Sequence, residues 1–369
     1  MKFKLSDFAK VGSSKRIYAK EYRKSGIPFY RGKEIIAKSE GRKVDNVLFI
    51  SKDKYNDLSK RASVPQENDI LISAVGTIGK IYHVDQKDIP FYFKDGNLIR
   101  IYDYNLSLID PYYLYYLLKS NYAQDKIKKI EIGSTQKAIT IKDISNMKFD
   151  IPSLKKQQEV ARIPKLIDTR IKLNDKINDN LLELSRNIFK KFFPNVNEGI
   201  DTIGNYIKNY DKYRKPLSKK QRNQMPGMYR YIGATSVNDY INKYNFNGIY
   251  LLLGEDGTVQ DDKGYPILQY IHGKFWPNNH AHVLQGKVVS TEWLYLFFLQ
   301  KNIQEIVTGA VQKKISQKNL NSLKVNIPNE NELKNFDDFI QPIFKKIRIL
   351  EDENIALEKL KQQFLNQFF

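Results

Sequence analysis

The sequence predicts an α+β protein with two strand-rich globular modules in pseudo-two-fold repeat. Each module is followed by a long helix, and the two helices pack as an antiparallel coiled-coil handle. Two observations predict this fold. The chain aligns with itself at a constant offset of 176 residues, and each copy ends in an apolar stripe with helical spacing. A length of 369 residues with 41% hydrophobic residues allows two such modules with packed cores.

The duplicated segment contains the same short motif twice. Gly133-Ser-Thr-Gln-Lys-Ala-Ile139 falls on Gly309-Ala-Val-Gln-Lys-Lys-Ile315, and an Ile-Pro pair follows each copy. No gap is needed between Gly133 and Phe193, which indicates an internal duplication. We therefore expect four parts: a first module at 1–152, a central helical spacer at 153–198, a second module at 199–328 and a C-terminal helical spacer at 329–369.

Short runs of β-branched and aromatic residues predict the strands of the first module. Gly76-Thr-Ile-Gly79 follows one of them, and its two glycines allow a tight turn or a close approach of the backbone to a ligand. Asp110 is a favoured N-cap and Pro111 a favoured first helical residue, so a helix should follow as far as Leu118. The expected strands are Val47–Ile50, Ile70–Ser73, Asn97–Ile101 and, after a loop at Gly133–Ile141, Lys148–Ile151.

After each module, apolar residues recur at steps of three, four or six, which is typical of a long helix with a coiled-coil-like seam. Pro164 predicts a break, so the uninterrupted first helix should begin near Lys165. Asn174 and Asn178 lie in or beside the seam, where a polar residue fixes the register. The residues predicted to form the seam and dock partners are Ile167, Ile171, Leu181, Leu184, Ile188, Ile343, Ile347, Leu357, Leu360 and Phe364.

The second module repeats the order of these elements. It opens with Thr202–Ile207, and a basic run from Lys212 to Arg222 follows. Its counterparts of the first-module elements are a strand at Gly248–Leu253, a turn at Gly254–Thr258 and a helix at Trp293–Phe298.

The composition bounds the class of protein. Sixty-one Lys and Arg residues against 41 Asp and Glu give a formal charge of +20, which favours a polyanionic partner, most often nucleic acid. A lysine-rich composition imposed by an AT-rich genome is the alternative explanation. The absence of cysteine removes disulfides and thiolate metal sites. No signal peptide or 18-residue apolar run is present, so we expect a soluble, cytoplasmic protein without membrane contact.

The duplication and the order of its parts resemble the specificity subunit of type I restriction–modification enzymes, over essentially the whole chain. The paired Gly-x-x-Gln-Lys loops with their Ile-Pro pairs carry most of the resemblance. Further similar segments are Ile27–Ile35, Tyr229–Thr235 and Asn278–Leu284. The resemblance implies that each module is a target recognition domain reading one half of a split double-stranded DNA sequence.

The resemblance also implies partners. The helices would set the distance between the half-sites and dock methyltransferase subunits, two copies of which follow from the pseudo-symmetry. Restriction or translocase subunits would complete the complex. No cofactor is expected in this chain: S-adenosylmethionine, and ATP with Mg²⁺, would bind to partner subunits. A related system with a fused nuclease–methylase partner fits the sequence equally well.

The residues themselves give little sign of catalysis. Asp110-Pro-Tyr-Tyr113 resembles the Asp-Pro-Pro-Tyr pattern of adenine methyltransferases but lacks the second proline, and helix capping accounts for it. No phosphate-binding loop is present, and Glu332-Leu-Lys334 lacks the upstream Asp of a nuclease motif. His280 and His282 could form a metal pair, but no third ligand stands at suitable spacing. We therefore predict a non-catalytic chain with no metal site.

Basic residues with interleaved tyrosines favour DNA binding, because Lys and Arg neutralise phosphates. A Gln side chain suits adenine, so Gln136 and Gln312 are the preferred DNA-facing residues of the two loops. The alternative for each lysine is a solvated surface residue, and the alternative for the two loops is a structural turn. Discrimination between half-sites should lie in divergent parts such as 33–61 and 231–247. The predicted contacts are Lys15, Arg16, Arg31, Lys33, Gly76, Thr77, Gln136, Lys137, Lys212, Arg214, Lys215, Lys219, Arg222, Gly257, Thr258, Gln312 and Lys313.

The length of the first helix gives a prediction for the DNA target. A helix from Lys165 to Phe193 would be about 43 Å long, which corresponds to roughly 13 base pairs of DNA. We therefore expect a bipartite target whose non-specific gap is somewhat less than one turn of DNA. Two other classes of function stay open. A self-sufficient DNA methyltransferase would transfer methyl groups without a partner, and a coiled-coil adaptor for acidic proteins would be indifferent to DNA sequence.

Overall fold

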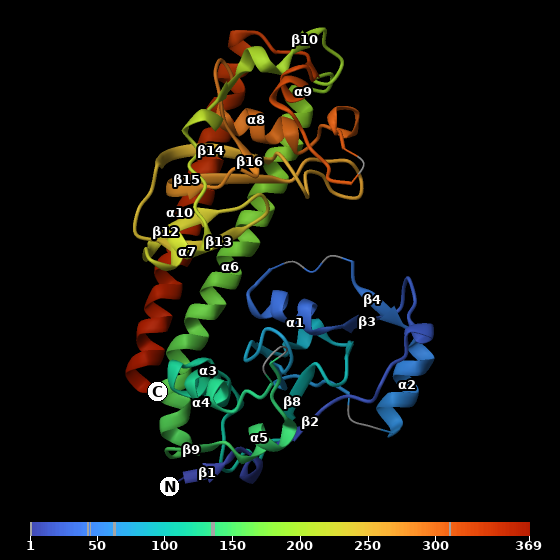
Figure 1. The fold of residues 1–369 in the computed structure, drawn as a ribbon, viewed down its shortest axis with the longest axis vertical. Helices are drawn as coiled ribbons and strands as arrows, with labels where there is room; N and C mark the ends of the chain where they lie inside the picture. Colours follow the sequence, from blue (N-terminus) through green and yellow to red (C-terminus); the bar gives the residue numbers. More distant parts are fainter. Residues whose placement is uncertain (1, 43, 45, 62–63, 134–136, 310) are drawn as a thin grey trace. The chain divides into compact units, whose positions relative to one another are not determined.

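The computed structural model describes residues 2–42, 44, 46–61, 64–133, 137–309 and 311–369 (Figure 1). The chain divides into two compact units. Unit 1 consists of Met1–Lys172 and Asn354–Phe369, and unit 2 consists of Leu173–Glu353. Each unit therefore holds one globular module together with a part of each long helix. In the described part of the chain, no helix is long and apolar enough to cross a membrane.

In the residues that the structure describes, unit 1 contains three small sheets. The largest is antiparallel in the order β2(Lys10–Gly12), β8(Leu98–Tyr102), β5(Ile70–Ser73) and β6(Ile81–His83). A three-stranded sheet has the order β4(Leu48–Ile50), β3(Ile27–Tyr30) and β7(Tyr92–Phe93), and β1(Lys2–Lys4) pairs with β9(Lys148–Asp150). Five helices complete the module: α1(Gly32–Ser39), α2(Lys52–Arg61), α3(Pro111–Lys119), α4(Asn121–Lys129) and α5(Ile141–Asn146).

The predicted helix at Asp110 is confirmed, with the predicted cap. Asp110 Oδ1 accepts a hydrogen bond from the Tyr113 backbone N–H at 2.8 Å, and Pro111 is the first helical residue of α3. Leu114 and Leu118 on this helix join the core under β5 and β8. The four predicted strands of this module are confirmed to within a residue at each end.

Unit 2 is built on one six-stranded sheet. Its order is β11(Ile207–Asn209), β16(Ala281–Gly286), β14(Phe246–Gly254), β15(Leu268–Pro277), β12(Pro226–Ile232) and β13(Val237–Ile241). β12 and β15 run parallel, and the other neighbours are antiparallel. The remaining elements are β10(Asp201–Thr202), β17(Lys324–Val325), α7(Lys219–Asn223), α8(Thr291–Phe298) and α9(Gln317–Asn321).

Helix α8 confirms the expected counterpart of α3. The Ser290 side chain caps it by accepting from the Trp293 N–H. Trp293 and Phe297 are buried in a core that also contains Leu253 of β14 and Phe336 of the last helix.

The two long helices are α6(Leu154–Phe192) and α10(Glu330–Phe368), each of 39 residues. The prediction that α6 starts near Lys165 is wrong, because the helix runs through Pro164. A proline removes one backbone hydrogen bond, but Val160, Ala161 and Ile167 are buried on either side of it and hold the helix together. A 39-residue helix is about 58 Å long, so the DNA gap estimated from the shorter helix loses its basis.

Within each unit, the start of one long helix lies beside the end of the other. In unit 1, Lys361 Nζ near the end of α10 is 2.6 Å from Asp168 Oδ1 on α6. In unit 2, the ring of Phe336 near the start of α10 is 5.6 Å from that of Phe189 near the end of α6. Both units therefore show the predicted antiparallel packing of the two helices.

The predicted seam is correct for some residues and wrong for others. Ile167 and Ile347 are buried, whereas Leu184 and Leu360, which the repeat makes equivalent, are 48% and 51% exposed. Ser185 and Lys361, their neighbours in the chain, are buried instead. The spacing of apolar residues predicted that Leu184 and Leu360 point into the helix interface. The buried positions are instead occupied by the small Ser185 and by Lys361, which is paired with Asp168. The other predicted seam residues, Ile171, Leu181, Ile188, Ile343, Leu357 and Phe364, are partly exposed.

Candidate nucleic-acid interface

The glycine turn and the repeated loop lie side by side in both modules. The Gly76 N–H donates to the Lys137 carbonyl at 3.1 Å, and the Gly257 N–H donates to the Lys313 carbonyl at 2.9 Å. The two glycines have φ values of 76° and 78°, which side chains other than glycine rarely adopt, and a Cβ atom at either would meet nothing within 4 Å. Each turn thus leaves open space beside an exposed loop. Gln136 lies outside the described residues.

Most of the predicted DNA contacts are exposed. In unit 1, the Lys137 ammonium is 2.7 Å from Glu131 Oε2, and the Arg16 guanidinium lies 5.7 Å above the Tyr18 ring. In unit 2, the Lys212 ammonium lies 4.9 Å above the Tyr213 ring. The exposed members of the predicted set are Lys15, Arg16, Lys33, Gly76, Thr77 and Lys137 in unit 1, and Lys212, Lys215, Lys219, Gly257, Thr258, Gln312 and Lys313 in unit 2.

Three of the predicted arginines, Arg31, Arg214 and Arg222, are partly buried and bind carboxylates of the chain. Arg31 Nη2 is 2.5 Å from Oε1 of the buried Glu34, and Arg222 Nε is 3.1 Å from Asp239 Oδ2. Arg214 is the most enclosed of the three, with a side chain 12% exposed. A dense run of basic residues does not distinguish such structural arginines from those free to meet a phosphate.

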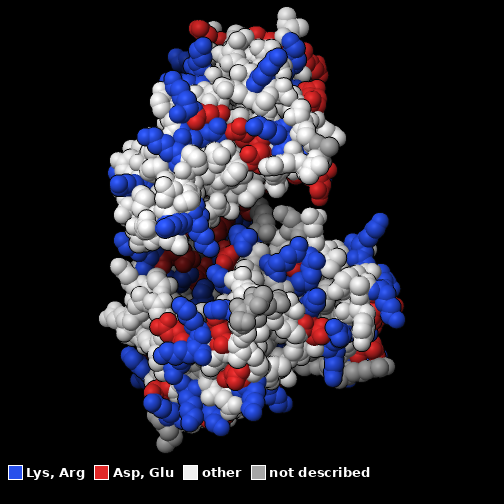
Figure 2. All heavy atoms as spheres, in the orientation of Figure 1, with Lys and Arg blue, Asp and Glu red and all other residues white. Residues whose placement is uncertain are grey.

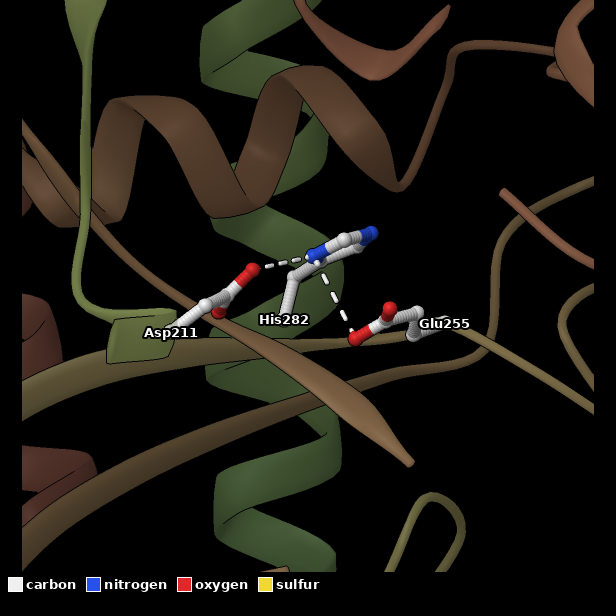
Figure 3. A group of neighbouring side chains, drawn as sticks. All are labelled: Asp211, Glu255 and His282. Atoms are coloured by element: carbon white, nitrogen blue, oxygen red, sulfur yellow. Dashed lines mark hydrogen bonds and ion pairs between the residues drawn. The ribbon is translucent and has the colours of Figure 1, made fainter. Parts of the chain in front are cut away.

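Arg214 belongs to a compact charged group that we call the Asp211 cluster: Asp211, Arg214, Glu255 and His282. Arg214 Nη1 is 2.6 Å from Glu255 Oε2, and Arg214 Nη2 is 3.5 Å from Asp211 Oδ2. His282 Nδ1 is 2.6 Å from the same Asp211 oxygen and 3.8 Å from Glu255 Oε2 (Figure 3). The His282 side chain is 1% exposed.

The cluster shifts the pKa values of its members. Burial lowers the pKa of the His282 imidazole, but the hydrogen bond and charge of Asp211, the Ile315 carbonyl and the charge of Glu255 together raise it above its usual value. Burial likewise raises the pKa of the Asp211 carboxyl, and the hydrogen bonds and charge of its partners lower it below its usual value. Both shifts favour the charged pair.

Asp211, Glu255 and His282 offer ligand atoms that all lie within 4.8 Å of one another, a spacing that could hold a metal ion. These atoms already have other partners. The Asp211 carboxylate accepts from the Val283 N–H at 2.8 Å and faces the imidazole, and Arg214 bonds to Glu255. A guanidinium in contact with both carboxylates repels a cation, so the donor set fits an ion-pair network better than a metal site.

The sequence could not show this cluster. It places His282 close to His280, yet the two imidazoles have different partners in the fold. His280 lies just before β16, is 51% exposed and contacts Asp256 at 2.6 Å. The two histidines, whose spacing could have suited a metal pair, therefore do not face a common site. The carboxylates of Asp211 and Glu255 come from segments distant in sequence from His282, so no local spacing predicts the cluster.

Charged side chains of both signs are found on each unit. On the face drawn in Figure 2, Lys and Arg side chains are interspersed with Asp and Glu over each unit. The excess of basic residues therefore produces many separate sites for phosphate contacts rather than one continuous basic band on this face.

Two modules of one plan, each exposing a glycine turn beside a lysine-bearing loop, define a duplicated protein with the same turn and loop arrangement in both copies. The family model described as "Type I restriction modification DNA specificity domain" matches residues 1–183 and again residues 205–359. The chain belongs to this family and carries its domain twice, as the sequence predicted.

Relatives support the assignment. The chain is 24% identical to the putative type I restriction enzyme MjaX specificity subunit of Methanocaldococcus jannaschii, over 85% of this chain and 80% of that protein. It is 22% identical to the MjaIX specificity subunit of the same organism, over 69% of this chain and 67% of that protein. A putative specificity subunit of Haemophilus influenzae, S.HindORF215P, is 32% identical, over 35% of this chain and only 32% of that protein.

The fold also has a known counterpart. The crystal structure of the type I restriction–modification system S subunit from M. genitalium superposes with a TM-score of 0.54 at 15% identity, covering 100% of this chain and 96% of the other. At this identity the likeness concerns the fold alone. It agrees with two strand-rich modules and two packed helices.

Proposed function

We propose that this chain recognises a bipartite double-stranded DNA target, one half through each module, and directs methyltransferase subunits to it. One observation carries the proposal: the glycine turn and the Gln-Lys loop are hydrogen-bonded in the same way in both modules. A duplicated site on one chain suits a target with two separated halves. Lysines beside each loop would neutralise phosphates.

The helices support a scaffolding role, because the repeat preserves their exposed apolar residues. Apolar side chains exposed in both copies of a duplication favour binding to the same kind of partner at each copy. Two methyltransferase subunits would meet this condition, one on each equivalent surface. The exposed pairs, each 176 residues apart, are Ile163 with Phe339, Leu173 with Ile349, and Leu184 with Leu360.

In this proposal, the chemistry takes place on the partners. S-adenosylmethionine, and ATP with Mg²⁺, would bind to the methyltransferase and restriction subunits, and this chain would select the DNA sequence on which they act. The cytoplasm, where DNA and these cofactors are found, would be its compartment.

Methylation sequencing tests the proposal. DNA from cells that carry this chain, its neighbouring methyltransferase, both or neither is sequenced for modified bases. We expect a split motif that is present only when both proteins are expressed. Methylation by this chain alone would make it an enzyme, and the absence of any motif with both proteins would refute the proposal.

Mutation of one loop separates sequence recognition from a general affinity for polyanions. Gln312→Ala should change or relax the second half of the methylated motif and leave the first half unchanged. An adaptor for acidic proteins would tolerate this change, so an unaltered motif would count against base recognition by this loop.

A further inference from the structure

The Asp211 cluster joins the segments of unit 2 that the sequence predicted to contact DNA. Asp211 and Arg214 stand at the start of the basic segment, which continues to Lys215. Glu255 begins the turn that contains Gly257 and Thr258. His282 contacts the backbone at the end of the Gln312–Ile315 loop, where its Nε2 is 2.9 Å from the Ile315 carbonyl oxygen. One largely buried group of charges thus connects three segments that carry predicted DNA contacts.

The contacts of His282 require two protons on its ring. Nδ1 faces the Asp211 carboxylate at 2.6 Å and Nε2 faces the Ile315 carbonyl at 2.9 Å. Both partners are acceptors, and a neutral imidazole carries only one N–H. Both contacts are hydrogen bonds only when the ring is an imidazolium, whose charge Asp211 and Glu255 balance.

The first module has no such group at the equivalent positions. The Ala74 N–H donates to the Asn97 carbonyl as the Glu255 N–H donates to the His280 carbonyl. The same ladder makes Ile99 the counterpart of His282.

The neighbouring strand extends the comparison. Val11 pairs with Ile101 as Asn209 pairs with Leu284, which makes Ser13 the counterpart of Asp211. Serine, alanine and isoleucine therefore replace the three titratable residues, and none of these side chains titrates near neutral pH.

We propose that His282 is a positioning residue whose doubly protonated ring holds the Gln312–Ile315 loop against the basic segment, so that DNA recognition by the second module alone depends on pH. The inference rests on the proposed function and extends it to regulation of one half-site. When the ring loses a proton, one of the two acceptors faces a nitrogen lone pair. With the proton kept on Nδ1 beside Asp211, the Ile315 carbonyl loses its side-chain donor, and the loop is held only by backbone hydrogen bonds such as that from the Gly257 N–H to the Lys313 carbonyl.

The charged groups around the ring define the controls. Asp211 and Glu255 face His282, Arg214 bonds to Glu255, and Lys314 lies 3.9 Å from Glu255 Oε1. His280, paired with Asp256 on the adjoining turn, is a second histidine close to the loop, since Asp256 pairs with Lys314. His280→Gln therefore serves as the matched control for any effect of His282.

The protonation state is measured first, without DNA. The chain has four histidines, so ¹³C-labelled imidazole carbons can be assigned by NMR with one variant for each. We expect His282 to be protonated at pH 7, because both of its ring nitrogens face acceptors. A neutral His282 ring at pH 7 would overturn the proposal.

DNA binding is then measured with the complex of this chain and its methyltransferase. The probes are duplexes of the split motif found by methylation sequencing, intact or with one half replaced. Binding through the second half should weaken by about tenfold between pH 6.5 and 9, the size expected for the loss of one charge-assisted hydrogen bond. Binding through the first half should not change, and His280→Gln should retain the native profile.

Two variants separate titration from mere structure. His282→Gln should bind weakly at every pH, with a flat profile. Asp211→Asn removes the countercharge but keeps an acceptor for the Val283 N–H, so the midpoint of the profile should move to lower pH. An unchanged midpoint, or a flat profile in the native complex, would refute the inference. If no half-site is bound selectively at any pH, the proposed function itself fails.

Discussion

The buried ion pair between Lys361 and Asp168 allows a direct test of how the long helices are held together in unit 1. The Lys361 ammonium is 2.6 Å from Asp168 Oδ1, and the Tyr116 hydroxyl donates to Asp168 Oδ2 at 2.8 Å. The Lys361 and Asp168 side chains are only 6% and 20% exposed. The variant Lys361→Met removes the positive charge and leaves the carboxylate poorly hydrated.

We expect Lys361→Met to lower the free energy of unfolding by about 2–3 kcal/mol. Breaking a fully buried pair typically costs about 3–5 kcal/mol, and the loss is smaller here because Asp168 keeps its bond to Tyr116 and some contact with water. A loss of this size should lower the melting temperature by roughly 5–10 °C in a unit of this length.

Unit 2 shows how the same positions can be filled without charge. The 176-residue offset makes Ser185 the counterpart of Lys361 and Phe344 the counterpart of Asp168, and both are buried. The triple variant Tyr116→Phe/Asp168→Leu/Lys361→Met leaves no buried charge or hydroxyl without a partner, since Glu358, the other carboxylate in contact with Lys361, is 56% exposed and stays hydrated. It should therefore regain most of the stability that the single change removes.

Urea unfolding followed by circular dichroism measures both effects. Both tryptophans, Trp276 and Trp293, lie in unit 2, so their fluorescence follows that unit separately. The reasoning is refuted if Lys361→Met unfolds within 0.5 kcal/mol of the native chain (the usual range for surface changes), or if the triple variant is as unstable as the single one.

Three further predictions concern binding and pH. Leu184→Asp and Leu360→Asp should change the free energy of unfolding by less than about 0.5 kcal/mol, yet each should release one methyltransferase copy in size-exclusion chromatography; retention of both would contradict the docking proposal. Lys215→Ala should weaken binding to all DNA sequences alike and lower the salt slope by about one, whereas a sequence-dependent loss would mean that Lys215 reads bases. Since the pKa of His282 is raised on folding, its stabilising contribution is complete below the unfolded pKa of about 6.5 and is lost as pH rises through the folded pKa. Thermal melts should therefore show His282→Gln further below the native chain at pH 6 than at pH 9, and an equal difference at both would exclude the linkage.

Local sequence signals predicted the elements that depend on local physics. The cap at Asp110 and the strand at Ile70–Ser73 follow from residue preferences that act within one turn or one strand. The continuation of α6 through Pro164 depends instead on packing on both sides of the proline. Helix propensity is a local quantity and does not include the packing that compensates for the one lost hydrogen bond.

Long-range pairing marks the limit of prediction for the sheets. The duplication predicts two similar modules, but unit 1 divides its strands among small sheets whereas unit 2 joins six in one. The parallel pairing of β12 with β15 brings Arg230 beside Phe275. No motif in either strand specifies that partner, because the pairing buries side chains contributed by both strands.

In the candidate site too, the features set by local sequence could be predicted and those set by long-range contacts could not. The exposed loops could be proposed from the repeat, since Lys137 and Lys313 occupy matching positions. The roles of Arg214 and His282 could not, because each acts through carboxylates that the fold brings from distant segments. A basic residue in a cationic run has the same sequence signature whether it faces solvent or a buried carboxylate.

The frame that the two modules share cannot by itself distinguish two half-sites. Gly76 and Lys137 have the same hydrogen bond as Gly257 and Lys313, so these residues suit contacts common to any DNA, such as phosphates. Discrimination has to come from groups that differ between the copies. The Asp211 cluster is such a difference, and it lies directly beneath the shared frame. A change there can alter how one loop is held without altering the contacts that both modules make, and duplicated modules can diverge in this way while keeping one fold.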